Sequence, residues 1–387
     1  MVYVDSLNAI YPTNWKKHKL HDLCTINYGQ SPNRILDQDG IYPVVGTSGA
    51  TRKGKDYFID GETVIIGRKG SIDKPNYYNE KIWVIDTAFF TSDHKNLDCR
   101  WLYYYLDNSK LSRLNESTGV PSLSRATLYN LELLCPPIFE QQKISDILST
   151  WDRAIERVER LIEAKQRQKK GLIQGLLTGR LRFPEFGEPI EETGNIPDGW
   201  KSVEFHDFAT LAKKKIDPVL NDFNFHCVEL EHISQETGKI IGKTESKQQT
   251  SSKNYFQPGN VLFGKLRPYL HKFAYCDFEG VCSSEIWVLQ NKSICTSRYL
   301  FYLIQTDTFL SASVQTTGTK MPRSDWNVVK KTKFKLPILE EQERITSLLN
   351  RAELNIELLE KCLTHYKEQK KGLMQKLLTG EIRVKVD

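Results

Sequence analysis

Two stretches of the chain carry apolar residues at alternating intervals of four and three. The first stretch contains Ile144, Leu148, Trp151, Ile155, Val158 and Ile162. The second contains Ile345, Leu349, Ala352, Ile356, Leu359 and Leu363. This spacing lines apolar side chains along one seam of a helix and is typical of coiled coils. The pattern predicts two long helices, the first from about Glu140 to Thr178 and ~58 Å long at 1.5 Å per residue.

The two helical stretches are copies of one another. A shift of 201 residues places 136–182 on 337–383 without a gap, with 19 of the 47 positions identical. The identities gather in a Pro-x-x-x-Glu-Gln-x-x-Ile start and a Lys-Lys-Gly-Leu-x-Gln-x-Leu-Leu-Thr-Gly end, where glycine suits a left-handed cap. Two such seams can bury each other, most simply in an antiparallel pair. The alternative is two independent helices, each packed on its own domain.

The segments outside the helices, 12–135 and 197–335, are related only weakly. Both open with Pro-x-x-Trp, and both contain short β-branched and aromatic runs separated by turn residues, which favour strands. The shared landmarks are the openings at 12–15 and 197–200, apolar runs at 64–67 and 261–264, and aromatic helix-like runs at 100–106 and 298–303. We therefore expect two divergent globules between copies of one helix.

This organisation predicts an α+β protein with a pseudo-twofold internal repeat, in which two mixed α/β globules alternate with two long helices forming an antiparallel coiled coil. The expected domains are globule 1 at 1–135, helix 1 at 136–182, a Pro- and Glu-rich connector at 183–196, globule 2 at 197–335, and helix 2 with a C-terminal strand at 336–387.

Composition excludes several classes of protein. The 387 residues include 54 Lys and Arg against 48 Asp and Glu, a net charge of +6 too mild to indicate nucleic acid by itself. No apolar run is long enough to span a membrane, and residues 1–5 do not begin a signal peptide. The eight cysteines are scattered, so we expect reduced thiols in a cytoplasmic protein, with no metal site. No catalytic motif holds, which predicts a non-enzymatic chain without a cofactor of its own.

Basic residues instead follow glycine-rich turns and strands at corresponding places in the two globules. Such loops let backbone amides approach phosphates, while Arg and Lys supply attraction and can read guanine edges. The candidate DNA-binding residues are Arg52, Lys53, Lys55, Arg68, Lys69 and Ser71 in globule 1, and Lys265, Arg267, Tyr269, Lys272, Ser284, Lys320 and Arg323 in globule 2. Each cluster taken alone could also be an ordinary solvated loop.

The basic end of helix 1, at 160–182, permits three interpretations. Its charges could complement the helix dipole, lie over DNA phosphates, or bind an acidic partner surface.

Together these features resemble the specificity subunit of a Type I restriction–modification system, and the resemblance spans essentially the whole chain. The strings that carry it are the Pro-x-x-Trp openings and the two helix motifs. Two further strings resemble two types of target recognition domain: Ile66-Gly67-Arg68-Lys69-Gly70-Ser71 and Phe263-Gly264-Lys265-Leu266-Arg267-Pro268.

The resemblance implies that each globule is a target recognition domain for one half of a bipartite, asymmetric site in double-stranded DNA. The helices would set the spacing between half-sites and dock two methyltransferase (modification) subunits, with restriction/translocase subunits joining them. S-adenosylmethionine, ATP and Mg would belong to those partners. Two alternatives remain open, a stand-alone DNA-binding regulator and a coiled-coil scaffold for protein interactions.

Overall fold

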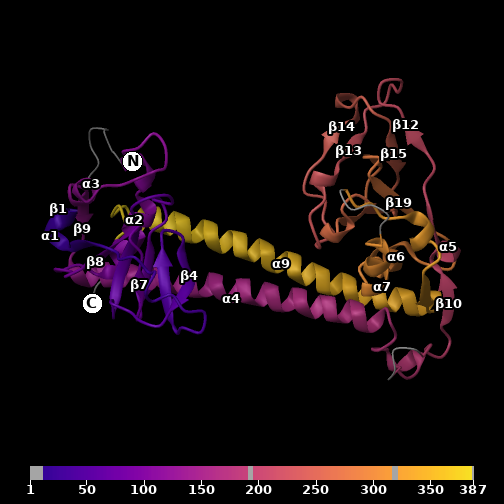
Figure 1. The fold of residues 1–387 in the computed structure, drawn as a ribbon, viewed down its shortest axis with the longest axis horizontal. Helices are drawn as coiled ribbons and strands as arrows, with labels where there is room; N and C mark the ends of the chain where they lie inside the picture. The colour runs from indigo at the N-terminus through magenta and orange to yellow at the C-terminus, as the bar shows by residue number, and fades with distance from the viewer. Residues whose placement is uncertain (1–11, 191–194, 316–320, 386–387) are drawn as a thin grey trace. The chain divides into compact units, whose positions relative to one another are not determined.

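The computed structural model describes residues 12–190, 195–315 and 321–385. It divides into two compact units, the first comprising 1–159 with 361–387 and the second 160–360. Each unit therefore contains one globule, the start of the long helix that follows it, and the end of the other long helix. The first globule is indigo to violet in Figure 1, and the second is pink to orange.

The α-helices are α1 (Leu20–Leu23), α2 (Cys99–Asn108), α3 (Arg125–Tyr129), α4 (Ile138–Leu176), α5 (Phe205–Phe208), α6 (Ser297–Leu303), α7 (Asp307–Ser313), α8 (Trp326–Val329) and α9 (Leu339–Leu377). The strands of the first globule are β1 (Lys16–Lys19), β2 (Thr25–Tyr28), β3 (Tyr42–Gly46), β4 (Gly49–Gly54), β5 (Glu62–Gly67), β6 (Asn76–Asn79), β7 (Trp83–Val84), β8 (Ala88–Ser92) and β9 (Glu132–Cys135).

The strands of the second globule are β10 (Lys201–Glu204), β11 (Ala209–Leu211), β12 (Lys215–Ile216), β13 (His226–Val228), β14 (Thr244–Glu245), β15 (Lys253–Phe256), β16 (Val261–Gly264), β17 (Phe273–Tyr275), β18 (Gly280–Cys282), β19 (Ile286–Asn291) and β20 (Lys333–Leu336). The apolar and aromatic runs expected as a strand and a helix in each globule are β5 and α2 in the first, and β16 and α6 in the second.

The two globules share the strand order of their two-stranded and four-stranded sheets despite their divergent sequences. In each, the first strand pairs antiparallel with the strand that precedes the long helix, β1 with β9 and β10 with β20. In each, a four-stranded antiparallel sheet follows, in the order β2-β8-β5-β6 or β11-β19-β16-β17. A further mixed sheet completes each globule, β4-β3-β7 in the first and β12-β15-β18-β13-β14 in the second. The internal repeat therefore extends beyond the helices.

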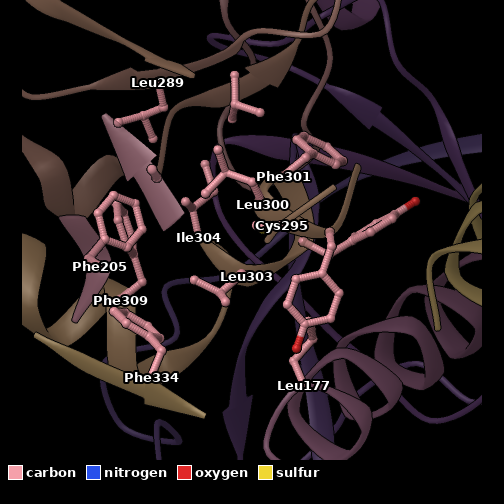
Figure 2. Packing of buried hydrophobic residues seen from close by; sticks show 14 of the residues in the cluster. Leu177, Phe205, Leu289, Cys295, Leu300, Phe301, Leu303, Ile304, Phe309 and Phe334 are labelled. Atoms are coloured by element: carbon pink, nitrogen blue, oxygen red, sulfur yellow. The ribbon is translucent and has the colours of Figure 1, made fainter. Parts of the chain in front are cut away.

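The core of each unit includes both long helices. In the second unit, Leu177 just beyond the end of α4 packs in one cluster with Phe205, Leu300 and Phe334 of the globule, as Figure 2 shows. The same cluster contains Ile345 and Leu349 from the start of α9. In the first unit, the corresponding cluster joins Ile144 and Leu148 of α4 to Met374, Leu377 and Leu378 at the end of α9.

The helices α4 and α9 pack together as an antiparallel pair. Within the first unit Lys370 pairs with Asp152 and Lys367 with Glu159, and within the second Lys169 pairs with Glu353. Residue numbers rise along one helix as they fall along the other, which is the antiparallel order. Each helix has 39 residues, within two residues of the expected bounds at both ends of α4.

All twelve predicted seam residues are buried or half-buried, but the ends of the seam serve another purpose. Ile144 and Leu148 complete the core of the first globule, and Ile345 and Leu349 that of the second. The heptad pattern alone could not distinguish residues that pack in the core of a globule from residues that pack between the two helices. The expected C-terminal strand is also wrong, because residues 378–385 form turns and irregular backbone.

Candidate nucleic-acid interface

The repeated Glu-Gln pair joins the start of each long helix to the rest of its unit. The Trp15 Nε1–H donates to Glu140 at 3.1 Å, and the Trp200 Nε1–H donates to Glu341 at 2.9 Å. Both glutamates are buried, 2% exposed, and each also accepts two hydrogen bonds from an arginine beyond the end of the other helix. That arginine is Arg383 for Glu140 and Arg182 for Glu341. The Pro-x-x-Trp and Glu-Gln motifs are thus parts of one anchor.

The glutamine of the motif fixes the helix that crosses the globule. The Gln141 side-chain oxygen accepts the backbone N–H of Asp98, the N-cap of α2, at 2.8 Å. The Gln342 oxygen accepts the backbone N–H of Thr296, the N-cap of α6, also at 2.8 Å. Both amides donate to the carbonyl of the proline five residues earlier. A buried amide with these partners is satisfied, which explains why glutamine stands in both copies.

The Thr-Gly ends of the helices have a steric reason. Gly179 and Gly380 have φ of +78° and +76°, a region that favours glycine. A Cβ on Gly179 would lie 2.3 Å from Pro197, and one on Gly380 would lie 2.7 Å from Pro12. Each glycine therefore allows the helix end to approach the opening proline of a globule.

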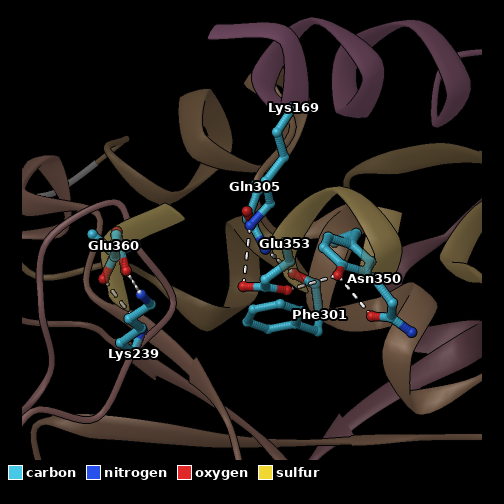
Figure 3. Close-up of polar contacts among 9 residues, drawn as sticks. Lys169, Lys239, Phe301, Gln305, Asn350, Glu353 and Glu360 are labelled. Atoms are coloured by element: carbon cyan, nitrogen blue, oxygen red, sulfur yellow. Dashed lines mark hydrogen bonds and ion pairs between the residues drawn. The ribbon is translucent and has the colours of Figure 1, made fainter. Parts of the chain in front are cut away.

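The first lysine of the Lys-Lys-Gly-Leu string anchors the helix to the globule. The Lys169 ammonium lies 3.1 Å from Glu353, and the Tyr302 hydroxyl donates to the same carboxylate at 2.8 Å and lies 2.8 Å from Asn350 (Figure 3). In the first unit Lys370, Asp152 and Tyr104 repeat the arrangement, with a Tyr104–Asp152 distance of 2.6 Å. Burial and the neighbouring carboxylate raise the pKa of both tyrosines, so their hydroxyls remain donors.

The predicted DNA-binding residues of globule 1 fall into two places. Arg68 and Lys69 both donate their backbone N–H to Thr87, and Gly70 donates to Pro121 at 2.9 Å. The Ser71 hydroxyl lies 3.3 Å from that of Ser48, so the loop at 68–71 meets the turn at 46–49. Lys69 and Ser71 are exposed there.

Arg52, Lys53 and Lys55 are exposed as well, but they extend from that turn along and just beyond β4. At ~3.3 Å per residue, Arg52 lies about 10 Å from Gly49 along the strand.

In globule 2 the backbone brings three distant segments together. Lys265 donates its N–H to Glu285 at 2.9 Å, Arg267 donates to Pro322 at 2.8 Å, and Ser324 donates to Lys265 at 2.8 Å. The predicted residues Lys265, Arg267, Ser284 and Arg323 therefore lie on one surface of globule 2, with Arg267, Ser284 and Arg323 exposed. Tyr269, in the short turn after Arg267, is 53% exposed.

Two of the predicted DNA-binding residues, Lys272 and Lys320, stand apart from the others. The Lys272 ammonium donates to the Leu230 carbonyl at 2.6 Å, so this lysine holds the fold and is only half-exposed. Lys320 lies outside the described residues.

Sequence reasoning missed Tyr28, Arg125 and Glu285. The Tyr28 ring, 45% exposed, contacts two guanidinium groups, with Arg68 at 5.1 Å and Arg125 at 5.0 Å from its centroid. An exposed aromatic ring flanked by cations suits contact with bases and phosphates. Nothing in the local sequence links these residues, because β2 and α3 are brought together only by the fold.

Other chemistry finds little support in the described part of the chain. Residues 12–190, 195–315 and 321–385 contain no group of three His, Cys, Asp or Glu placed to hold a metal ion. Within the same ranges no helix is both long and apolar enough to cross a membrane. All eight cysteines are free, and burial raises the pKa of Cys24 and Cys135 to about 12.

Comparisons with known proteins agree on one family. The family described as the Type I restriction modification DNA specificity domain matches residues 12–166 and 197–365. The EcoDI specificity subunit of Escherichia coli is 22% identical over 96% of this chain and 88% of its own length. The MjaVIII specificity subunit of Methanocaldococcus jannaschii is 24% identical over 97% of this chain and 94% of its own.

Solved structures show the same fold. The S subunit of a Type I system from M. genitalium superimposes with a TM-score of 0.61 at 14% identity, covering 98% of both chains. A chain from a study of complex assembly and conformational transition of the type I R-M system gives a TM-score of 0.57 at 13% identity, covering 96% of this chain and 99% of that one.

Proposed function

Because the chain belongs to the family of Type I restriction modification DNA specificity domains, we propose that it selects the DNA target for a Type I restriction–modification complex. Each globule recognises one half of a bipartite, asymmetric site in double-stranded DNA. The chain itself is the non-catalytic specificity subunit.

The observation that carries this proposal is the combination of identical anchors with different basic loops. The Trp–Glu–Arg and Lys–acid–Tyr clusters recur in both units with the same partners. The surfaces around Arg68 and Arg267, by contrast, differ in sequence and in backbone contacts. Two globules that are attached in the same way but have different basic surfaces suit the recognition of two different DNA sequences.

The paired helices support the spacing role. Each globule is attached to both α4 and α9 through side chains that are largely buried, so it cannot swing freely on a linker. The helices thereby fix the number of unspecific base pairs between the half-sites. The duplicated design also offers two equivalent surfaces for two modification subunits, as pseudo-twofold symmetry requires.

The chemistry belongs to the partners in this proposal. The modification subunits carry S-adenosylmethionine and methylate a flipped adenine, while restriction/translocase subunits use ATP and Mg. The eight free cysteines suit a protein of the reducing cytoplasm.

The decisive experiment uses the source cells. The chain is purified from lysate with a tag, and adenine methylation is mapped across the genome with and without its gene. Co-purification of a methyltransferase and loss of a bipartite methylated motif on deletion are the expected results. Unchanged methylation with no co-purifying methyltransferase would reject the proposal.

The same preparation distinguishes the alternatives. A stand-alone regulator would bind one genomic sequence tightly without partners. A coiled-coil scaffold would show no salt-dependent binding to DNA at all.

A further inference from the structure

We propose that Arg323 reads one base pair of the half-site of globule 2, and that Glu285 is the positioning residue that aims its guanidinium. This inference rests on the proposed function and assigns a task to a residue pair within it.

The pair leaves one edge of the guanidinium available. Arg323 donates from Nε to Glu285 at 2.9 Å and from Nη2 to the other carboxylate oxygen at 3.2 Å. A guanidinium has five N–H groups, of which this side-on contact uses two. Nη1 donates no hydrogen bond to the described residues, so one of its N–H groups and the second N–H of Nη2 form a free end-on fork.

The backbone holds both residues in fixed places. Arg323 forms an antiparallel bridge with Leu266, and on either side of it Pro322 accepts from Arg267 and Ser324 donates to Lys265. Ser324 is 7% exposed and its hydroxyl donates to the Ser313 carbonyl at 2.7 Å. Glu285 accepts the Lys265 N–H through its own carbonyl. The fork is therefore directed by the fold.

The charge on Glu285 favours base recognition by Arg323 over simple attraction to a phosphate group. The hydrogen bond from Arg323 and the positive charge of the nearby Lys265 lower the pKa of Glu285, so its carboxylate stays ionised at neutral pH. An ionised carboxylate beside Arg323 cancels most of the attraction of Arg323 for a phosphate group. It does not remove the directed donors. Positioning the guanidinium explains why an acidic residue stands on a DNA-binding surface. The Arg323 side chain is 49% exposed and that of Glu285 26%, so the fork is accessible to DNA.

The ligand that fits a free end-on fork is a pair of acceptors side by side. Guanine offers N7 and O6 in the major groove, and a phosphate offers two oxygens. Lys265 and Arg267 on the same surface can supply phosphate contacts, which leaves the oriented fork for the base.

The test compares wild type with Arg323→Lys and Glu285→Gln, each assembled with its modification subunits and given a library of randomised DNA duplexes. Exposed Arg351 of α9 provides the control Arg351→Lys. Lysine keeps the charge but loses the fork. We expect Arg323→Lys to reduce discrimination at one G·C pair of one half-site by about 5- to 150-fold. Glu285→Gln is expected to relax the same position by a smaller factor, with the other half-site unchanged.

Three results would overturn the inference. The first is full retention of the wild-type base preferences by both variants. The second is a uniform loss for all sequences with a salt slope reduced by about 1, which is the mark of a phosphate contact. The third is an effect of Glu285→Gln at a different position from that of Arg323→Lys. If the wild-type assembly itself shows no sequence preference, the proposed function fails instead.

Discussion

Arg182 and Glu341 form a two-pronged ion pair inside the second unit, with N–O distances of 3.0 and 3.1 Å and side chains only 3% and 2% exposed. The equivalent pair of the first unit, Arg383 and Glu140, has the same geometry, but its arginine is 41% exposed. Removing either arginine leaves a buried carboxylate, but water can reach Glu140 through the exposed position that Arg383 vacates, whereas the position of Arg182 is closed to solvent.

We therefore expect Arg182→Met to lower the free energy of unfolding of the second unit by about 3–5 kcal/mol. The matched variant Arg383→Met should cost the first unit clearly less. Urea denaturation of the two variants measures both effects. Equal losses would contradict the interpretation that burial makes the difference.

Lys169 and Lys170 are adjacent, but only the first is an anchor. Lys169 pairs with Glu353 with side chains 13% and 19% exposed, whereas Lys170 is exposed. Lys169→Met should cost about 1–3 kcal/mol, because the Glu353 carboxylate loses a buried partner. Lys170→Met should leave the denaturation midpoint within error of wild type, and a comparable loss in both variants would refute the anchor.

His94 gives the first globule a pH dependence with a definite sign. Burial lowers its pKa below the ordinary 6.5, against the opposing influence of Glu62, Asp93 and Asp98, and the ring lies 3.0 Å from the Thr91 hydroxyl. The unfolded chain therefore binds a proton before the folded one, so stability falls as the pH drops below about 6.5. His94→Gln should reduce this fall. The measurement is the melting temperature between pH 5 and 8, and an identical fall in both proteins would exclude His94 as its source.

A substitution in one globule should affect only the half-site that this globule recognises. Arg68→Gln, and likewise Lys69→Gln, should weaken recognition of one half-site about tenfold or more, since a good base contact contributes ~1–3 kcal/mol. Arg267→Gln or Lys265→Gln should weaken the binding of DNA by globule 2 through a lost phosphate contact and leave the preference at the half-site of globule 1 unchanged. Methylation of a randomised duplex library reports each half-site separately. An equal loss at both half-sites from any one of these variants would show that the globules are not independent readers.

Tyr28→Leu tests the flanked ring in the same assay. It removes the surface on which Arg68 and Arg125 lie, and we expect it to impair the same half-site as Arg68→Gln.

Lengthening both helices should lengthen the spacer. Seven residues inserted after Glu159 in α4 and after Glu360 in α9 keep the heptad register and add ~10.5 Å, or about three base pairs. The preferred spacer should grow by that number with unchanged half-sites, as methylation mapping would reveal. Insertion in α4 alone should abolish activity by shifting one helix against the other. An unchanged spacer after the double insertion would disprove the ruler.

Local patterns were enough to predict the helices, the duplicated motifs and strands β5 and β16. They could not predict what the motifs do, because the partners of Glu140 lie 125 and 243 residues away in the sequence. The same reason hid Glu285, which meets Arg323 only through a bridge between separate loops. The strand order that the globules have in common was hidden too, since it depends on long-range pairing that a few residues shared by the two copies do not encode.

The first unit contains the globule that precedes α4 together with the end of α9 and the residues just after it, among them Leu377, Leu378 and Arg383. A ribosome delivers those residues after the whole of the second unit. The second unit can close once residue 360 has emerged, whereas the first must wait with its apolar face uncovered until residue 383 has followed. The earlier of the two globules is therefore the one that finishes folding later, and a chain that stops near residue 360 loses the integrity of its first globule.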